Sequence, residues 1–145
     1  MKAYHHGNLK KELIKIACKL CERDGYTKLS IRSLAKESKV SQTAPYRHFK
    51  TKEDLYAAIT KEGFDKLNKE MLSIKAKNPK NYLIDCGKSY IDFGLKNANT
   101  YDLMFGTAVG NYADYPELSE SANNLFQILL SNFKKLSSDD EETVA

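Results

Sequence analysis

Apolar residues recur every three or four positions along most of this 145-residue chain, which is the spacing of amphipathic α-helices. The first stretch predicts a helix over about 8–24, with Asn8 as its N-cap and Gly25 ending it in a left-handed conformation. Ser30 is the N-cap of a short second helix over about 30–38. No segment alternates with period two long enough to indicate a strand. The pattern therefore predicts an all-α fold of roughly seven helices.

The next polar caps divide the remainder of the chain. Ser41 is the N-cap of a third short helix in the segment SQTAPYRHF. Thr51, with Asp54 three residues later, opens a long helix that reaches about residue 77 and is ended by Pro79. Further helices are expected over about 81–96, around 101–108 and from about 116 onward.

Pro45 lies within the third predicted helix, where a proline removes a backbone donor. With Ser41 as N-cap, Pro45 is the fourth helical position and forgoes only the first intrahelical hydrogen bond. We therefore expect it to stiffen and pack the start of a short helix rather than to break it.

Charge is distributed unevenly along the chain. Residues 1–60 contain 13 Lys and Arg against 6 Asp and Glu, a net charge of +7, while residues 61–145 contain 10 against 13, a net charge of −3. A basic half is typical of a nucleic-acid contact surface, although a solvated basic face is the commoner cause of a modest excess. The chain has no apolar run near the roughly 20 residues of a membrane-spanning helix and no secretory signal, so a cytoplasmic protein is expected.

The three cysteines are an odd number, which argues against a disulfide framework. Cys18 and Cys21 form a C-x2-C pair, but a second ligand pair is missing and no strand precedes them, so burial is favoured over a metal or redox site. On the predicted helix, Cys21 falls at the edge of the apolar stripe and Cys18 outside it. We expect no metal and no cofactor.

The first three predicted helices form a tri-helical helix-turn-helix unit, whose second short helix would enter the major groove of DNA. Gln42 and Thr43 lie in its first turn, where side chains reach base edges, and glutamine can pair bidentately with adenine. Several side chains that can donate hydrogen bonds to phosphate follow these two residues in the sequence. The ordinary alternatives are a surface helix that happens to carry such residues, a structural histidine at His48 and core packing of Phe49.

The segment YRHFKTKEDL matches the pattern Tyr-x-His-Phe-x-x-Lys-Glu-x-Leu and, with the helices before it, resembles the DNA-binding domain of the TetR (tetracycline-repressor) family of bacterial regulators. The resemblance implies a double-stranded DNA operator as partner. It further implies phosphate contacts from Tyr46, His48 and Lys52, base-edge contacts from Gln42 and Thr43, a base within reach of Arg32, and backbone or base contact from Arg47.

The resemblance also implies two domains, a helix-turn-helix DNA-binding domain at 1–51 and a helical ligand-sensing body at 52–145. In the family, the body binds a small-molecule inducer among its helices and thereby shifts the helix that follows the DNA-binding unit. Aromatic and methionine residues at helical spacing are more often core than ligand contacts. The candidate ligand-binding residues are Tyr82, Tyr90, Phe93, Tyr101, Met104, Phe105, Tyr112 and Phe126.

The sequence departs from the family pattern at two places. Lys39 stands in the turn where members usually have glycine, so a side chain must accept a left-handed φ. Members generally continue through two helices that pair with a second subunit, whereas this sequence stops at Ala145; either it is truncated or dimerisation uses other surfaces.

The favoured function is a ligand-responsive transcription regulator, a repressor that binds a palindromic operator as a homodimer. The alternative is a helical ligand-binding module whose operator binding is weak or lost. An enzyme is not expected, because no nucleophile motif, metal-ligand pair or glycine-rich phosphate loop accompanies the three histidines. The arm that contains His5 and His6 is expected beside the DNA backbone or in the minor groove.

Overall fold

The computed structural model describes residues 8–142, so the arm with His5 and His6 lies outside the described residues. Within that range every regular element is helical and no strand is present, which confirms the all-α fold. Six α-helices and three short 3-10 helices (η) make up the described part. Their bounds are α1 Leu9–Asp24, η1 Tyr26–Lys28, α2 Ile31–Glu37, η2 Pro45–Arg47, α3 Lys52–Leu72, α4 Pro79–Lys96, α5 Ala98–Phe105, η3 Tyr112–Asp114 and α6 Pro116–Glu142.

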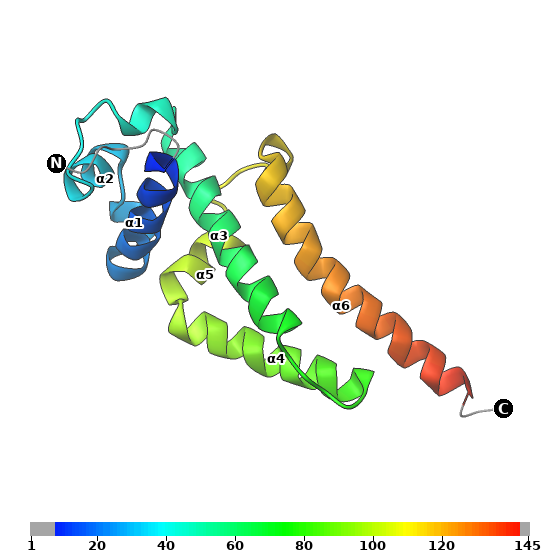
Figure 1. The fold of residues 1–145 in the computed structure, drawn as a ribbon. Coiled ribbons are helices and arrows are strands. Elements are labelled where there is room, and N and C mark those ends of the chain that lie inside the picture. The colour runs from blue at the N-terminus through cyan, green and yellow to red at the C-terminus, as the bar shows by residue number, and fades with distance from the viewer. Residues whose placement is uncertain (1–7, 143–145) are drawn as a thin grey trace.

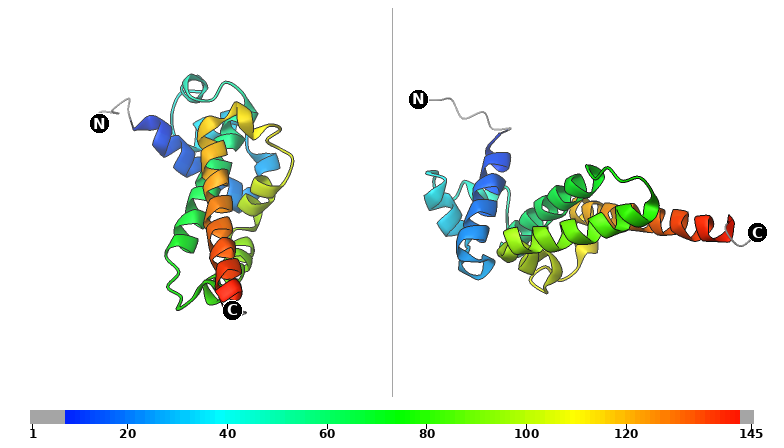
Figure 2. Two further views of the ribbon diagram at one scale, coloured as in Figure 1. Left: turned by 90° about the vertical axis from the view of Figure 1, so that its right-hand side faces the viewer. Right: turned by 90° about the horizontal axis from the view of Figure 1, so that it is seen from below.

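The helices form a small N-terminal head and a longer body that share α3. Figure 1 shows α1 and α2 gathered at the start of α3, with α6 running alongside α3 and its last turns extending beyond the other helices. Both views in Figure 2 place the head at one end of the molecule and the C-terminus at the other. The most extensive contact between two helices is that of α3 with α6, and α5 packs against both α1 and α3.

The hydrophobic core is continuous from the head into the body because α3 buries residues on several sides. Asn68, a polar residue within this core, donates from Nδ2 to the carbonyl of Ser121 on α6 at 2.8 Å. This bond satisfies the donor side of the buried amide, whereas Asn68 Oδ1 has no hydrogen-bond partner among the described residues. The hydrogen bond between Asn68 and Ser121 thus joins α3 directly to α6.

The long helix ends earlier than the sequence pattern predicts. It stops at Leu72, where the Ser73 hydroxyl donates to the Glu70 carbonyl at 2.7 Å and the Ile74 amide bonds to the Met71 carbonyl, only three residues earlier, at 3.2 Å. Pro79 does not end this helix. It begins α4, whose N-cap Asn78 accepts from the amide of Asn81 at 2.8 Å.

The caps of α1 also differ from expectation in part. The side chain of Asn8 makes no capping hydrogen bond, whereas Gly25 has the positive φ of 83° that the glycine was expected to supply. None of the helices in the described range is both long enough and apolar enough to cross a membrane.

Candidate nucleic-acid interface

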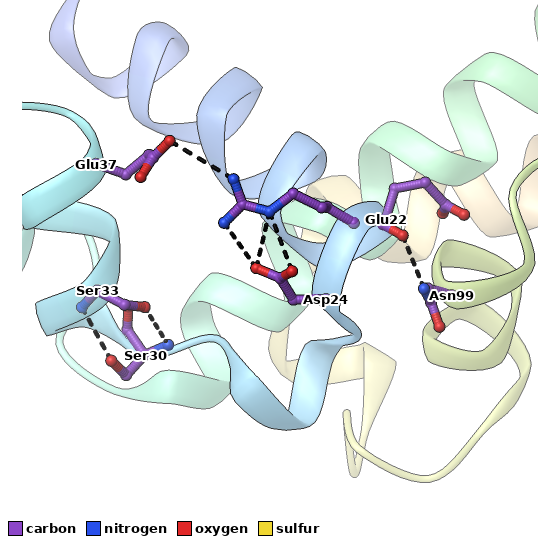
Figure 3. Close-up of polar contacts among 7 residues, drawn as sticks. Glu22, Asp24, Ser30, Ser33, Glu37 and Asn99 are labelled. Atoms are coloured by element: carbon purple, nitrogen blue, oxygen red, sulfur yellow. Dashed lines mark hydrogen bonds and ion pairs between the residues drawn. The ribbon is translucent and has the colours of Figure 1, made fainter.

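The short helix α2 is held at its start by a reciprocal cap. The Ser33 amide donates to the Ser30 hydroxyl oxygen and the Ser30 amide donates to the Ser33 hydroxyl oxygen, both at 2.9 Å (Figure 3). Two backbone donors that would otherwise be unsatisfied are thereby paired. The sequence predicted Ser30 as the cap and missed Ser33, since Glu or Gln more commonly occupies that position.

Lys39 ends α2 in the left-handed conformation that the sequence predicted, with φ of 55°. Its amide donates to the Lys36 carbonyl and the Val40 amide to the Ala35 carbonyl, each at 3.2 Å. This pair of bonds is the Schellman arrangement that usually places glycine at the position of Lys39. The backbone therefore turns as in a glycine-containing helix-turn-helix, despite the side chain.

The third element of the head is not the α-helix that the sequence predicted. Residues 42–44 form turns and only Pro45–Arg47 is helical, as the 3-10 helix η2. Pro45 lacks the amide that would bond to Ser41 four residues earlier, so the Ala44 amide bonds to Ser41 instead, at 3.1 Å. The loss at Pro45 is therefore larger than one terminal hydrogen bond. In most of this segment each amide bonds to the carbonyl three residues earlier, as in a 3-10 helix, and not four residues earlier, as in an α-helix.

Side chains of this segment divide between the core and the surface. Pro45 is buried and Phe49 is only 2% exposed, which confirms that both pack inward. Gln42, Thr43 and Arg47 are exposed, and Tyr46 is half exposed. The buried residues therefore fix the segment on the head while its polar residues stay accessible to a partner.

The structure brings Arg32 and Gln42 together. Both line a hollow of about 510 Å³ between α2 and the turn that follows it. Lys36, one helical turn beyond Arg32, lines the same hollow and was missed by the sequence interpretation. Its spacing of four residues from Arg32 was the signal that could have found it. The cationic side chains of Arg32 and Lys36 and the amide of Gln42 thus line one hollow. Such groups can donate hydrogen bonds to the edge of a base or to a phosphate.

The start of α3 carries the predicted capping box. The Asp54 amide donates to Thr51 Oγ1 at 3.1 Å, and Asp54 Oδ2 accepts from the amides of Thr51 and Lys50 at 3.0 Å each. Lys52 is exposed, with its Nζ 5.5 Å from the centroid of the Tyr56 ring. A cationic donor is thus held beside a well-ordered helix start.

The same helix start is tied to the body by residues that sequence reasoning missed. The Tyr115 hydroxyl donates to Asp54 Oδ1 at 3.3 Å, and the Gly110 amide donates to Glu53 Oε1 at 3.0 Å. Burial, with the two nearby carboxylates, raises the pKa of Tyr115 to about 12, so it remains a donor at neutral pH. The loop before α6 thus contacts the element that carries Lys52.

His48 is placed differently from its neighbours Tyr46 and Arg47. It is half-buried, its ring lies 6.5 Å from that of Phe49, and it lines a hollow of about 510 Å³ that Asp54 and Tyr115 also line. His48 therefore lies at the junction between head and body, whereas Tyr46 and Arg47 lie on the exposed surface of the head.

The candidate ligand-binding residues do not all lie in one cluster. Three of them, Tyr90, Tyr101 and Phe105, pack ring against ring, and the hydroxyls of the two tyrosines are 2.6 Å apart. Burial raises the pKa of Tyr90 to about 12. The others are dispersed: Phe93 and Met104 are buried core, Tyr112 donates to the Met104 carbonyl, and Phe126 on α6 is 59% exposed. Tyr82, the further candidate, donates to the Met71 carbonyl at 2.8 Å.

The cysteines are free thiols among the described residues. Cys21 is fully buried rather than at the edge of the apolar stripe, and burial raises its pKa to about 11. Cys18 is partly buried, and its pKa is raised to about 12 by burial and by Glu62. Between residues 8 and 142, no group of three or more His, Cys, Asp or Glu side chains could hold a metal ion.

Comparison with known families identifies this head. Residues 13–59, from α1 to the first turns of α3, match the family described as bacterial regulatory proteins, tetR family. This part of the chain is similar to the tetR family. The proteins matched are described as regulatory proteins or transcriptional regulators.

Three individual proteins are similar to this chain in sequence or in fold. The chain is 37% identical over 67 residues to the uncharacterized HTH-type transcriptional regulator YuxN of Bacillus subtilis (strain 168); the match covers 46% of this chain and only 23% of YuxN. A protein of unknown function from Rhodococcus sp. RHA1 has the same fold, with a TM-score of 0.80 and 25% identity over 96% of this chain and 73% of that one. A tetR-family transcriptional regulator from Streptomyces coelicolor matches with a TM-score of 0.70 and 20% identity, over 90% and 60% of the two chains.

Proposed function

We propose that this protein is a transcription regulator that binds double-stranded DNA through α2, the segment 41–49 and the start of α3. The observation that carries the proposal is the hollow shared by Arg32 and Gln42, next to a segment whose buried Pro45 and Phe49 leave its polar side chains exposed. Base edges are read by such amide and guanidinium groups, while tyrosine, arginine and lysine position the phosphate backbone. The match of residues 13–59 to the tetR family supports the same function.

We further propose that the protein represses transcription by binding a palindromic operator as a homodimer and that a small molecule releases it. Support for a dimer comes from large apolar side chains left on the surface of the body. Ile91 and Leu95 on α4 are 64% and 78% exposed, and Phe126 and Phe133 on α6 are 59% and 56% exposed. A second copy covering these side chains would also link two heads, which raises affinity for a two-fold operator.

The test is to select duplexes from a random pool and to measure their affinity by fluorescence anisotropy at several salt concentrations. Affinity should fall steeply with salt. Lys52→Ala should weaken all duplexes and lower the salt slope by about one, whereas Gln42→Ala should reduce discrimination at one position by roughly 1–3 kcal/mol. Lys69→Ala, which removes an exposed lysine from the far part of α3, is the matched control and should leave both quantities unchanged.

Equal binding of all duplexes, or binding insensitive to salt, would contradict the proposal. A protein that binds small molecules, sediments only as a monomer and retains no duplex would instead be the helical ligand-binding module considered above.

A further inference from the structure

A cleft of about 630 Å³ lies at the junction of head and body. One wall is α1, which contributes Ile14 and Cys18, and the opposite wall is α3, with Ile59 and Gly63. Phe93 on α4 and Thr100 on α5 close its end. Phe93 is the only one of the eight candidate ligand-binding residues that lines this cleft. The cleft is therefore a different place from the ligand pocket that the sequence predicted.

The floor of the cleft is apolar. Ile59 is fully buried and Phe93 is 1% exposed, while Ile14 and Cys18 are half-buried along the wall. The raised pKa of Cys18 keeps its thiol neutral at physiological pH, so it adds no charge to this surface. A hydrocarbon portion of a ligand would be removed from water here, and a volume of this size is within the range of small-molecule sites.

The rim of the cleft carries an excess of positive charge. Four lysines line it, three of them one turn apart along α1, against the two carboxylates of Glu22 and Glu62. Glu22 is already occupied, since its Oε2 accepts from the amide and the hydroxyl of Thr100 at 3.0 and 2.9 Å. Among the residues whose side chains the structure describes, none of the four ammonium groups lies within 4.0 Å of a carboxylate oxygen. The four are Lys11, Lys15, Lys19 and Lys66.

Lys66 lies where the apolar and the cationic parts meet. Its Nζ is 5.9 Å from the centroid of the Phe93 ring and donates to Asn97 Oδ1 at 2.8 Å. An anionic group bound there would face ammonium groups from α1 and α3 while its apolar portion covered the floor. Positive charges that have no carboxylate partner, beside a buried apolar surface, are the complement of an anionic amphiphile.

We propose that this cleft is a binding site for an amphipathic carboxylate, with the carboxylate at the lysine rim and an alkyl chain of medium length on the floor formed by Ile14, Ile59 and Phe93. The occupant would contact the head and the body at once. It would also lie against the connection between them, where Asn99 Nδ2 donates to the Glu22 carbonyl at 2.7 Å (Figure 3). Binding at the cleft does not depend on the DNA-binding function proposed above, and the two are measured separately.

The experiment is calorimetric titration of the full chain with sodium decanoate below its micellar concentration, with decanol, butyrate and inorganic phosphate as comparison probes. Decanoate should bind, and butyrate should bind on the order of a thousandfold more weakly because it lacks six methylene groups. Decanol should bind roughly tenfold more weakly, because it has the chain without the charge. Added salt should weaken decanoate and leave decanol unchanged.

Matched variants locate the site. Lys15→Gln combined with Lys66→Gln should weaken decanoate by roughly fivefold to tenfold, as expected for two partly exposed ion pairs. Lys69→Gln combined with Lys80→Gln removes two exposed lysines of α3 and α4 that do not line the cleft, and should have no effect. Ile14→Gln, at a half-buried position that tolerates a polar group, should weaken decanoate and decanol alike. Circular dichroism confirms that each variant is folded.

The proposal is overturned if decanol binds as tightly as decanoate, if phosphate binds as tightly as decanoate, or if the two lysine pairs behave alike. It is also overturned if the Lys15 and Lys66 pair reduces affinity for duplex DNA and leaves decanoate binding intact, because these lysines would then serve the nucleic acid. Loss of duplex binding by the unaltered protein, with decanoate still bound, would refute the proposed function and leave the cleft proposal standing.

Discussion

Replacing Lys39 by glycine should stabilise the protein, although it removes a side chain. Lys39 has φ of 55°, which crowds its Cβ against the backbone, whereas glycine has no Cβ. Its side chain is exposed and makes no hydrogen bond or ion pair with another described side chain. The two backbone bonds of the turn, from the amides of Lys39 and Val40, involve no side chain and are retained.

The magnitude follows from two opposing effects. Relief of the left-handed conformation is worth about 1–2 kcal/mol for a residue with a Cβ. Glycine also makes the unfolded chain more flexible, which costs roughly 0.5–1 kcal/mol. The net gain for Lys39→Gly is therefore about 0.5–1 kcal/mol in the free energy of unfolding. For a chain of this size that corresponds to a rise in Tm of roughly 2–4 °C.

Urea unfolding followed by circular dichroism measures this difference, and Lys36→Gly is the matched control. Lys36 is three residues earlier, exposed and within α2, so the control makes the same chemical change in a right-handed helical backbone. It should lower the free energy of unfolding by up to about 1 kcal/mol, because glycine is a poor helix former. Equal destabilisation by the two substitutions would refute the assignment of a left-handed turn at Lys39.

Three other changes test the packing and the caps. Thr51→Ala removes the cap of α3 and should cost about 1 kcal/mol of stability in urea unfolding, whereas loss of less than a few tenths would contradict the capping box. Asn68→Ala removes the side-chain donor to the Ser121 carbonyl and should lower the free energy of unfolding by roughly 0.5–1.5 kcal/mol in the same assay; a neutral result would contradict the role of this bond in joining α3 to α6. Because the Cys18 thiol has a pKa of about 12 when folded against an ordinary 9.0, the unfolded chain loses this proton first and stability should fall as pH rises from about 9 to 12. The loss should be on the order of 1 kcal/mol at pH 10, and Cys18→Ala should show a smaller drop between pH 8 and pH 10 than the unaltered protein.

The features that the sequence predicted are those set by local chemistry. The caps at Ser30 and Thr51, the positive φ at Lys39 and the inward packing of Phe49 each depend on a few neighbouring residues. Helical periodicity extends over many positions, so the all-α fold followed from it as well. The positions of the candidate DNA contacts on the head could be anticipated, while their contacts with DNA remain predictions.

The features that the sequence did not predict depend on competition between alternatives or on distant partners. The segment around Pro45 was expected to be α-helical because its caps and apolar spacing fit, but spacing alone cannot decide between four-residue and three-residue hydrogen bonds. The contacts of Tyr115 with Asp54 join residues 61 positions apart. No local pattern encodes such a pair, nor the cleft formed when α1 packs across α3.

The length of α3 has a mechanical consequence. Its 21 residues run without interruption from the capped turn that carries Lys52 to the far part of the body, a distance of about 30 Å. A rod of that length that pivots at Leu72 by about 5° moves its other end by roughly 2.5 Å, which is close to the length of a hydrogen bond. A small pivot at Leu72 would therefore be enlarged at the capped end, by about the distance that separates a formed hydrogen bond from a broken one.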